Sequence, residues 1–167
     1  MKILKTNTEI QSSIIRTVSI INKKFIGKEI DLIALNDSPK YFIRDLTKKL
    51  TISYRILNLK FSNYDQRTPS GEVKITKDIQ EPIYNRHIIL VDGIIISGIT
   101  HYYIAKYLKQ RSPKSISILT VGIKLDLLIK KIPKCYALFN FNNEIVEGYG
   151  FGSDGFKRKK YLVDLRK

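Results

Sequence analysis

The sequence predicts an α/β fold in which a parallel-centred sheet is covered by helices on both faces. Apolar runs such as 30–35 and 115–121 hold at most one charged residue, which is typical of strands buried on both sides. Segments with helical spacing of apolar residues lie between these runs, for example at 8–24. An alternation of such strands with amphipathic helices favours a layered α/β architecture.

The first half of the chain supplies two helices and the first strands. Apolar residues recur at helical spacing through 8–24, and Gly27 gives that helix the usual end. A core strand is expected at 30–35, followed by a helix that begins at Pro39 with Ser38 as its N-cap. Two further strands are expected at 54–59 and 72–75, separated by a polar loop at 63–71.

The second half continues the alternation. A strand at 87–92 leads into a helix over 99–110, which stops before Pro113 because the residue preceding a proline is disfavoured in a helix. A buried strand at 115–121 is followed by a short helix at 126–131. The remaining strands are expected at 135–139, 145–146 and 161–165.

The composition is that of a globular protein with a strong positive charge. Its 167 residues are 43% hydrophobic and have a mean hydropathy of −0.15, which suits a single domain over 1–167. Thirty Lys and Arg against fifteen Asp and Glu leave a net charge of +15, which favours anionic partners such as nucleotides, diphosphates or nucleic acid. A compositional bias toward Lys, Ile and Asn explains the same charge equally well, and the cations are then solvated surface.

Cys135 is the single cysteine, so no intramolecular disulfide can form and a structural zinc site is not expected. No apolar run reaches the length of a membrane span, and the first residues begin no apolar stretch of signal-peptide length. We therefore expect a cytoplasmic protein that has no membrane association.

The segment 86–100, Arg-His-Ile-Ile-Leu-Val-Asp-Gly-Ile-Ile-Ile-Ser-Gly-Ile-Thr, is the most informative part of the chain. Its pattern indicates a buried strand that runs into a short loop and then opens a helix. Such a junction presents backbone N–H groups and small hydroxyls that favour a phosphate. Ligands gather at the carboxyl ends of strands in open α/β sheets, and two further strand ends, at 35–39 and 121–124, also carry polar residues.

The order of these loops, together with the terminal Glu147-Gly-Tyr-Gly-Phe151, resembles the hypoxanthine–guanine phosphoribosyltransferases, which have the type I phosphoribosyltransferase fold. The resemblance runs from about Asp31 to the C-terminus. It implies a small hood built from the terminal segments, and a purine nucleotide or phosphoribosyl diphosphate as ligand. It also implies Mg²⁺ as the cofactor of an active enzyme, and a homodimer or homotetramer.

The resemblance assigns the 5′-phosphate of the ligand to Ser97, Gly98, Ile99 and Thr100. Glycine permits a close backbone approach, hydroxyls stand at both ends of the loop, and the N-terminus of the following helix favours negative charge. This part of the family's site is complete in the sequence.

The acids that precede the phosphate loop in the family are mostly replaced. Asp92 stands at the first of two adjacent acids that hold the ribose hydroxyls and Mg²⁺, but Gly93 stands at the second. Ile96 occupies the position of the acid that serves as general acid or base near the purine. Because a positioned proton donor typically contributes about 10²–10⁴-fold to a rate, the sequence predicts a weak or inactive catalyst.

The resemblance assigns diphosphate binding to Asn36, Asp37 and Ser38 after the first strand, and to Arg158 near the C-terminus. Asp37 opposes an anionic ligand unless a metal intervenes, and the favoured interpretation is that Asp37 and Ser38 cap the following helix. Asp154 lies close to the position of a metal-binding acid. Arg158 belongs to a basic cluster that is also compatible with a polyanion site or with solvated surface.

The remaining site residues that the resemblance implies are aromatic or basic. Tyr64 matches the tyrosine of the mobile loop that closes over the reacting groups. Gly122 stands where the family has a lysine that contacts the purine 6-oxo group. Lys124 is a candidate substitute, although a solvated surface lysine is the favoured interpretation. Tyr136, with the adjacent Ala137, matches the position on which the base stacks, although a half-buried strand tyrosine is an equally good interpretation.

Three functions remain open from the sequence. The first is a divergent phosphoribosyltransferase of purine salvage that makes nucleotides from hypoxanthine or guanine. The second is a non-catalytic regulator that senses a nucleotide or phosphate, with a basic surface over 106–134 and 157–167 that binds nucleic acid. The third is an interaction subunit that needs only the fold.

Overall fold

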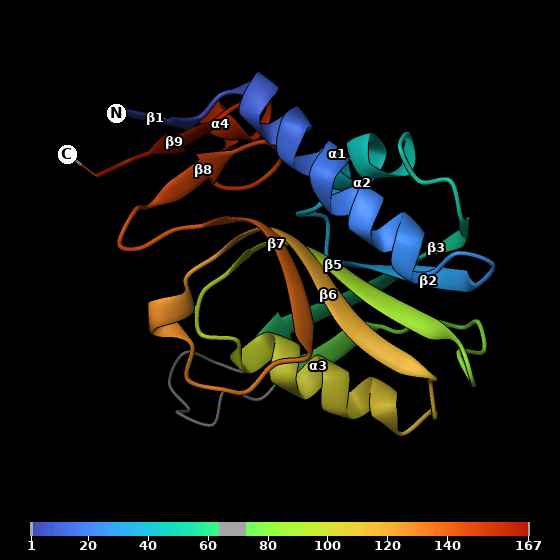
Figure 1. Cartoon of the computed structure of the whole chain (residues 1–167). Helices are drawn as coiled ribbons and strands as arrows, with labels where there is room; N and C mark the ends of the chain where they lie inside the picture. Colours follow the sequence, from blue (N-terminus) through green and yellow to red (C-terminus); the bar gives the residue numbers. More distant parts are fainter. Residues whose placement is uncertain (1, 64–72, 167) are drawn as a thin grey trace.

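The computed structural model describes residues 2–63 and 73–166 (Figure 1). Its main part is a six-stranded sheet of order β4-β3-β2-β5-β6-β7, in which only the β3–β4 pair is antiparallel. The strands are β2 (Glu29–Leu35), β3 (Ser53–Asn63), β4 (Val73–Lys77), β5 (His87–Ile95), β6 (Ser115–Ile123) and β7 (Lys134–Asn140). The predicted parallel-centred sheet is confirmed.

Helices cover both faces of the sheet. Figure 1 shows α1 (Asn7–Lys24) and α2 (Lys40–Thr47) on one side and α3 (Ile99–Lys109) on the other. Successive residues of a strand point to opposite faces, so Ile89 of β5 packs in the core under α1 and Leu90 in the core under α3. None of the helices described here is both long and apolar enough to cross a membrane.

The hood is a second, three-stranded antiparallel sheet of order β1-β9-β8. It joins β1 (Lys2–Lys5), β9 (Leu162–Asp164) and β8 (Val146–Gly148), and the short helix α4 (Asp154–Lys157) accompanies it. The two ends of the described chain therefore lie beside each other in Figure 1. The first strand was not predicted, because a four-residue strand with charged residues at both ends has no apolar pattern of its own.

Three local expectations were wrong. Ser38 does not cap α2: the N-cap is Pro39 without a side-chain hydrogen bond, and Ser38 stands one residue too early. The segment 126–131 is not a helix beyond the short 3₁₀ turn at Leu125–Leu127, because its backbone bonds elsewhere, with the Ile129 N–H donating to the Ser97 carbonyl at 3.0 Å. Strand β5 extends past residue 92, since its last residues still pair with β6.

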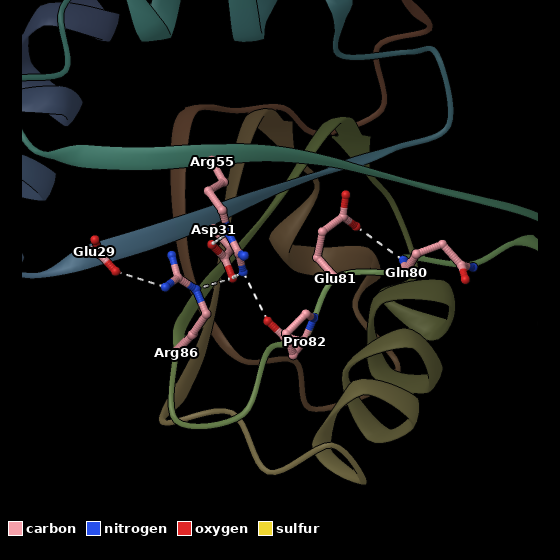
Figure 2. A network of polar contacts seen from close by, with 7 residues as sticks. All are labelled: Glu29, Asp31, Arg55, Gln80, Glu81, Pro82 and Arg86. Atoms are coloured by element: carbon pink, nitrogen blue, oxygen red, sulfur yellow. Dashed lines mark hydrogen bonds and ion pairs between the residues drawn. The ribbon is translucent and has the colours of Figure 1, made fainter.

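A buried carboxylate ties three strands together at the amino edge of the sheet (Figure 2). Asp31 of β2 is fully buried, and it accepts two hydrogen bonds from the Arg55 guanidinium of β3, at 2.7 and 2.8 Å. Arg86, directly before β5, donates to Asp31 at 2.7 Å and to Glu29 at 2.9 Å. Arg55 also donates to the Pro82 carbonyl at 3.0 Å. A bidentate contact of this kind fixes the register of the two strands and balances the buried negative charge.

The electrostatics of this cluster favour the charged form of Asp31. Burial would raise the pKa of the Asp31 carboxyl, but hydrogen bonds from Arg55 and Arg86 outweigh it and hold that pKa below its ordinary value. The folded state therefore stabilises the carboxylate relative to the unfolded chain, where the pKa of Asp is about 3.9.

We predict that Asp31→Asn lowers the free energy of unfolding by about 3 kcal/mol, because it leaves two guanidinium groups without their buried partner. Glu29→Gln is the matched control: the Glu29 side chain is 66% exposed, so its loss should change stability by less than about 1 kcal/mol. Urea denaturation of the two variants at neutral pH measures both values.

The stability difference between the parent protein and Asp31→Asn should depend on pH with a definite sign. Because the folded pKa of Asp31 is depressed, its contribution is fully present above about pH 4 and is lost as the pH falls through the folded pKa. A difference that stays constant from neutral into strongly acidic solution would contradict this assignment.

Candidate phosphate-binding site at the carboxyl edge

The polar strand ends that the sequence places at one edge of the sheet do lie together, and the hood covers them. A Cβ at Gly93 of β5 would lie 2.6 Å from the Ser38 Oγ and 3.0 Å from the Phe151 Cδ1. A Cβ at Gly150 would lie 2.9 Å from the Tyr41 ring and 3.2 Å from the Ser38 carbonyl oxygen. Glycine at both positions is therefore what lets the loop after β2, the end of β5 and the hood make contact.

The loop that follows β5 is a candidate anion site, because it leads directly into the N-terminus of α3. Gly98 is the N-cap of α3 and has a φ of 75°, and a Cβ there would lie 2.8 Å from the Ile132 Cγ2. Both the left-handed backbone and the close contact require glycine. The Ser97 Oγ accepts from the Ile99 N–H at 3.4 Å, and helical bonding begins with the Tyr102 N–H donating to the Gly98 carbonyl at 2.9 Å.

This geometry places Ser97, Gly98, Ile99 and Thr100 together at the start of an eleven-residue helix. The first turn of a helix directs its backbone amides away from the helix body and carries the positive end of the macrodipole. A phosphate group is a favourable ligand for that arrangement.

The one acid in this loop is already bonded on both oxygens. The Asp92 Oδ1 accepts from the Gly93 N–H at 2.7 Å, and its Oδ2 lies 2.9 Å from the Nε2 of His101. His101 belongs to α3 and is buried against the sheet. The sequence reasoning missed His101, although its position three residues before Ile104 places it on the buried face of the helix.

Asp92 is the carboxylate of this loop that could take part in binding magnesium. Each of its oxygens accepts one hydrogen bond and keeps a second lone pair, and Mg²⁺ is usually held by one or two carboxylates together with the phosphates of a substrate. Ile96 is 52% exposed and has no donor atom. Asp154 is 97% exposed and pairs with Lys157 at 2.9 Å. Among residues 2–63 and 73–166, no group of three or more His, Cys, Asp or Glu side chains is placed to hold a metal.

The loop after β2 is fixed by its neighbours. Asn36 has a φ of 56°, and its Oδ1 accepts from the Phe61 N–H of β3 at 2.9 Å. Asp37 is exposed and pairs with Lys60 at 3.0 Å, so a cation balances its charge. The repulsion of an anionic ligand that Asp37 would cause is thereby reduced.

The candidate base-binding residues lie apart from one another. A Cβ at Gly122 would lie 2.6 Å from both the Phe141 ring and the Ile94 Cδ1, so these side chains fill the space of the family's lysine. Lys124 is buried just beyond the end of β6. Tyr136 instead accepts a hydrogen bond from Lys24 of α1 at 2.8 Å.

The strand register explains this separation. Tyr136 and Ala137 lie opposite Leu119 and Thr120 in the middle of β6, whereas Lys124 follows the end of that strand. Five residues of extended chain span about 16 Å, so the structure does not bring Tyr136 and Lys124 together. Arg158 is exposed at the end of α4, and Tyr64 lies outside the described residues.

Comparisons with known proteins agree with this geometry. A sequence model of the phosphoribosyl transferase domain matches residues 1–154. The hypoxanthine phosphoribosyltransferase of Buchnera aphidicola subsp. Schizaphis graminum is 33% identical over 170 residues, covering 100% of this chain and 95% of that protein. The hypoxanthine-guanine phosphoribosyltransferase of Streptococcus mutans serotype c is 28% identical, with coverage of 99% and 93%. A crystal structure of a hypoxanthine-guanine phosphoribosyltransferase from Bacillus anthracis matches the fold with a TM-score of 0.94 at 24% identity, covering 99% of both chains.

We predict that restoring the second acid by Gly93→Asp destabilises the protein by about 1–3 kcal/mol, because the new Cβ meets Ser38 and Phe151. The double variant Gly93→Asp/Ser38→Gly should recover part of this loss, since it removes the nearer contact, and Ser38→Gly alone serves as the control. Urea denaturation measures all three. A Gly93→Asp protein as stable as the parent would refute the close packing described for this edge.

Proposed function

The chain belongs to the phosphoribosyltransferase family, of the hypoxanthine–guanine type, and from this premise we propose that it serves purine salvage as a slow transferase. It binds a purine nucleotide by its 5′-phosphate and transfers the phosphoribosyl group of phosphoribosyl diphosphate to hypoxanthine or guanine, with release of diphosphate. The observation that carries this proposal is Gly98, which stands at the N-terminus of α3 in the left-handed backbone that favours glycine.

The chemistry of the transfer is weakened at Ile96. The family places a carboxyl there to exchange a proton with the purine, and an isoleucine side chain can neither give nor accept one. A loss of about 10²–10⁴-fold in rate is the expected consequence. Because Ile96 is 52% exposed, the position has room for a polar side chain without repacking of the core.

Binding of the purine depends on Lys124 in this proposal. Its side chain is buried, it follows β6 at the carboxyl edge, and among the described residues it has no ion-pair partner. The Lys124 N–H donates to the Ile95 carbonyl at 2.9 Å, which fixes its backbone beside the end of β5. An ammonium group held there is suited to the 6-oxo group of the base. We do not assign base stacking to Tyr136 here, because it lies opposite Leu119 of β6, about five residues of extended chain before Lys124.

We assign diphosphate binding to Asn36, Asp37 and Ser38, on the loop that the ligand would approach. Arg158 would supply a positive charge to balance it. Lys60 beside Asp37 adds a compensating cation. We also propose a homodimer or homotetramer, by analogy with the relatives. Mg²⁺, when bound together with the diphosphate, would be held by Asp92 and would neutralise negative charge on the leaving group.

A second candidate is a non-catalytic regulator that senses a nucleotide. Two observations favour it: His101 engages Asp92, and the Phe141 ring and Ile94 fill the space beside Gly122. Its nucleic-acid partner would bind a basic groove of about 520 Å³ on α3 and the segments before β6 and β7. Lysines 106, 109, 114 and 131 contribute to the lining of that groove.

We predict that Ile96→Asp raises the turnover of hypoxanthine and phosphoribosyl diphosphate by about 10²–10⁴-fold over the parent, because it supplies the missing carboxyl. Ile96→Asn is the matched control, with the same shape and no carboxyl, and should remain at the parent's rate. Formation of inosine 5′-monophosphate, measured at high protein concentration, gives the rates.

Gly98→Ala separates binding from chemistry in the same experiment. It should abolish binding of inosine 5′-monophosphate by calorimetry, because its Cβ strains the loop and meets Ile132. Equal rates for Ile96→Asp and Ile96→Asn would contradict the proposed transferase. If no variant turns over while the parent still binds the nucleotide, the regulator is the correct function.

A further inference from the structure

The basic groove and the phosphate loop, residues 97–100, share a wall, because the side chain of Ile132 borders both. We propose that the groove binds a nucleoside polyphosphate, and that its occupation tightens the binding of a nucleotide at the phosphate loop. The ligand class follows from the lining of the groove. The effect on the phosphate loop rests on the proposed function.

Four lysines gather around the groove without acidic partners. Lys106, Lys109, Lys114 and Lys131 are exposed, and none of them forms an ion pair with an acid in the part of the chain that the structure describes. The first two lie in the last turn of α3, where a cation stabilises the carbonyl end of the helix. Lys114 and Lys131 lie on the segments before β6 and β7, so that explanation does not apply to them. Like charges around one concavity favour a ligand that carries several negative charges.

The groove also offers an apolar surface to a base. Ile116 and Ile132 line it together with two prolines, and Tyr102 adds an aromatic ring. Its volume of about 520 Å³ lies within the range of about 300–1,000 Å³ that is typical of sites for small ligands. An apolar lining beside several lysines matches a nucleoside that carries a chain of phosphates. A single-stranded nucleic acid has the same chemistry, and the experiment below separates the two.

The segment before β7 is the shared wall. On one side, a Cβ at Gly98 would lie 2.8 Å from the Ile132 Cγ2, and the Ile129 N–H donates to the Ser97 carbonyl at 3.0 Å. On the other side, Lys131 and Ile132 line the groove. A ligand that contacts this segment from the groove therefore acts on residues that pack against the phosphate loop.

The charges on the two walls set the direction of the effect. Without an anion between them, Lys131 on this segment and Lys106 and Lys109 on α3 repel one another. A polyphosphate that binds both walls removes this repulsion and holds the segment against α3. Because Ile132 packs against Gly98, the phosphate loop is then held more firmly in its left-handed conformation. Two ligands that favour the same conformation bind cooperatively, typically by about 5–150-fold.

The first test is calorimetry with adenosine 5′-triphosphate, which lacks the 6-oxo group of the proposed purine substrate. It should bind the parent protein, and Lys109→Gln/Lys131→Gln should weaken its binding by about tenfold or more, because two charged contacts are lost. Lys23→Gln/Lys48→Gln is the matched control: it removes the same charge from exposed positions at the ends of α1 and α2, on the other face of the sheet (Figure 1). Equal binding by the two double variants, or no binding by the parent, would overturn the inference.

An oligouridylate of about eight nucleotides, within the usual size of a single-stranded site, separates a free nucleotide from a nucleic-acid chain. It should bind no more tightly than adenosine 5′-triphosphate. If it binds the parent about tenfold more tightly and loses that binding in Lys109→Gln/Lys131→Gln, the groove takes a nucleic acid and the inference is wrong.

The second test measures the effect on the phosphate loop. Saturating adenosine 5′-triphosphate should tighten the binding of inosine 5′-monophosphate to the parent by about fivefold or more. Ile132→Ala should fold, since Ile132 is only half-buried, and should keep the lysines of the groove. It should lose the gain, because it no longer contacts Gly98. Unchanged or weaker binding of inosine 5′-monophosphate in the parent, or an equal gain in Ile132→Ala, would overturn the inference.

Failure of this inference differs from failure of the proposed function. Binding of inosine 5′-monophosphate that does not respond to adenosine 5′-triphosphate overturns the inference alone. Absence of any inosine 5′-monophosphate binding overturns the proposed function. In that case the amide shifts of Gly98 and Ile99 on addition of adenosine 5′-triphosphate report the coupling: they should appear in the parent and not in Ile132→Ala, and equal shifts in both would overturn the inference as well.

Discussion

The buried Asp31 carboxylate, held by Arg55 and Arg86, is the interaction on which the geometry of the site depends. It joins the amino ends of three adjacent parallel strands, β3, β2 and β5: Arg55 lies opposite Asp31 in the sheet, and Arg86 directly precedes β5. Strand β5 runs on to Ile95, past its last pair with β2, so the loop after β2 lies beside the last residues of β5, where a Cβ at Gly93 would lie 2.6 Å from the Ser38 Oγ. The two loops that the proposed function assigns to the 5′-phosphate and to the diphosphate therefore lie at the same edge of the sheet.

At the opposite edge of the sheet, close packing depends on glycines, which have no side chain. Gly93, Gly122 and Gly150 each leave space that a neighbouring side chain, such as Ser38, Phe141 or Tyr41, occupies. Two of these glycines stand where the family has an acid or a lysine. One substitution at each position therefore both removes a charge and allows the closer packing. Gly98 differs, because its backbone is left-handed, with a φ of 75°, and this conformation itself favours glycine.

The sequence predicts the parts of the fold that have a strong apolar periodicity. It does not predict contacts between residues that lie far apart in the chain. The core strands and the long helices α1 and α3 follow from their own patterns, and the meeting of polar strand ends follows from parallel topology. The Asp92–His101 bond, the direction of Tyr136 and the first strand depend on residues brought together only by the folded chain. The preferences of neighbouring residues carry no information about such contacts.

The central claim is that the loop between β5 and α3 still holds a phosphate. Titration of the ¹⁵N-labelled protein with inosine 5′-monophosphate, followed by amide chemical shifts, tests it most directly. The largest shifts should fall on Gly98, Ile99 and Thr100, with smaller ones at Lys124, and they should saturate together. Shifts confined to the lysines of the basic groove on α3, with none at the phosphate loop, would contradict the claim.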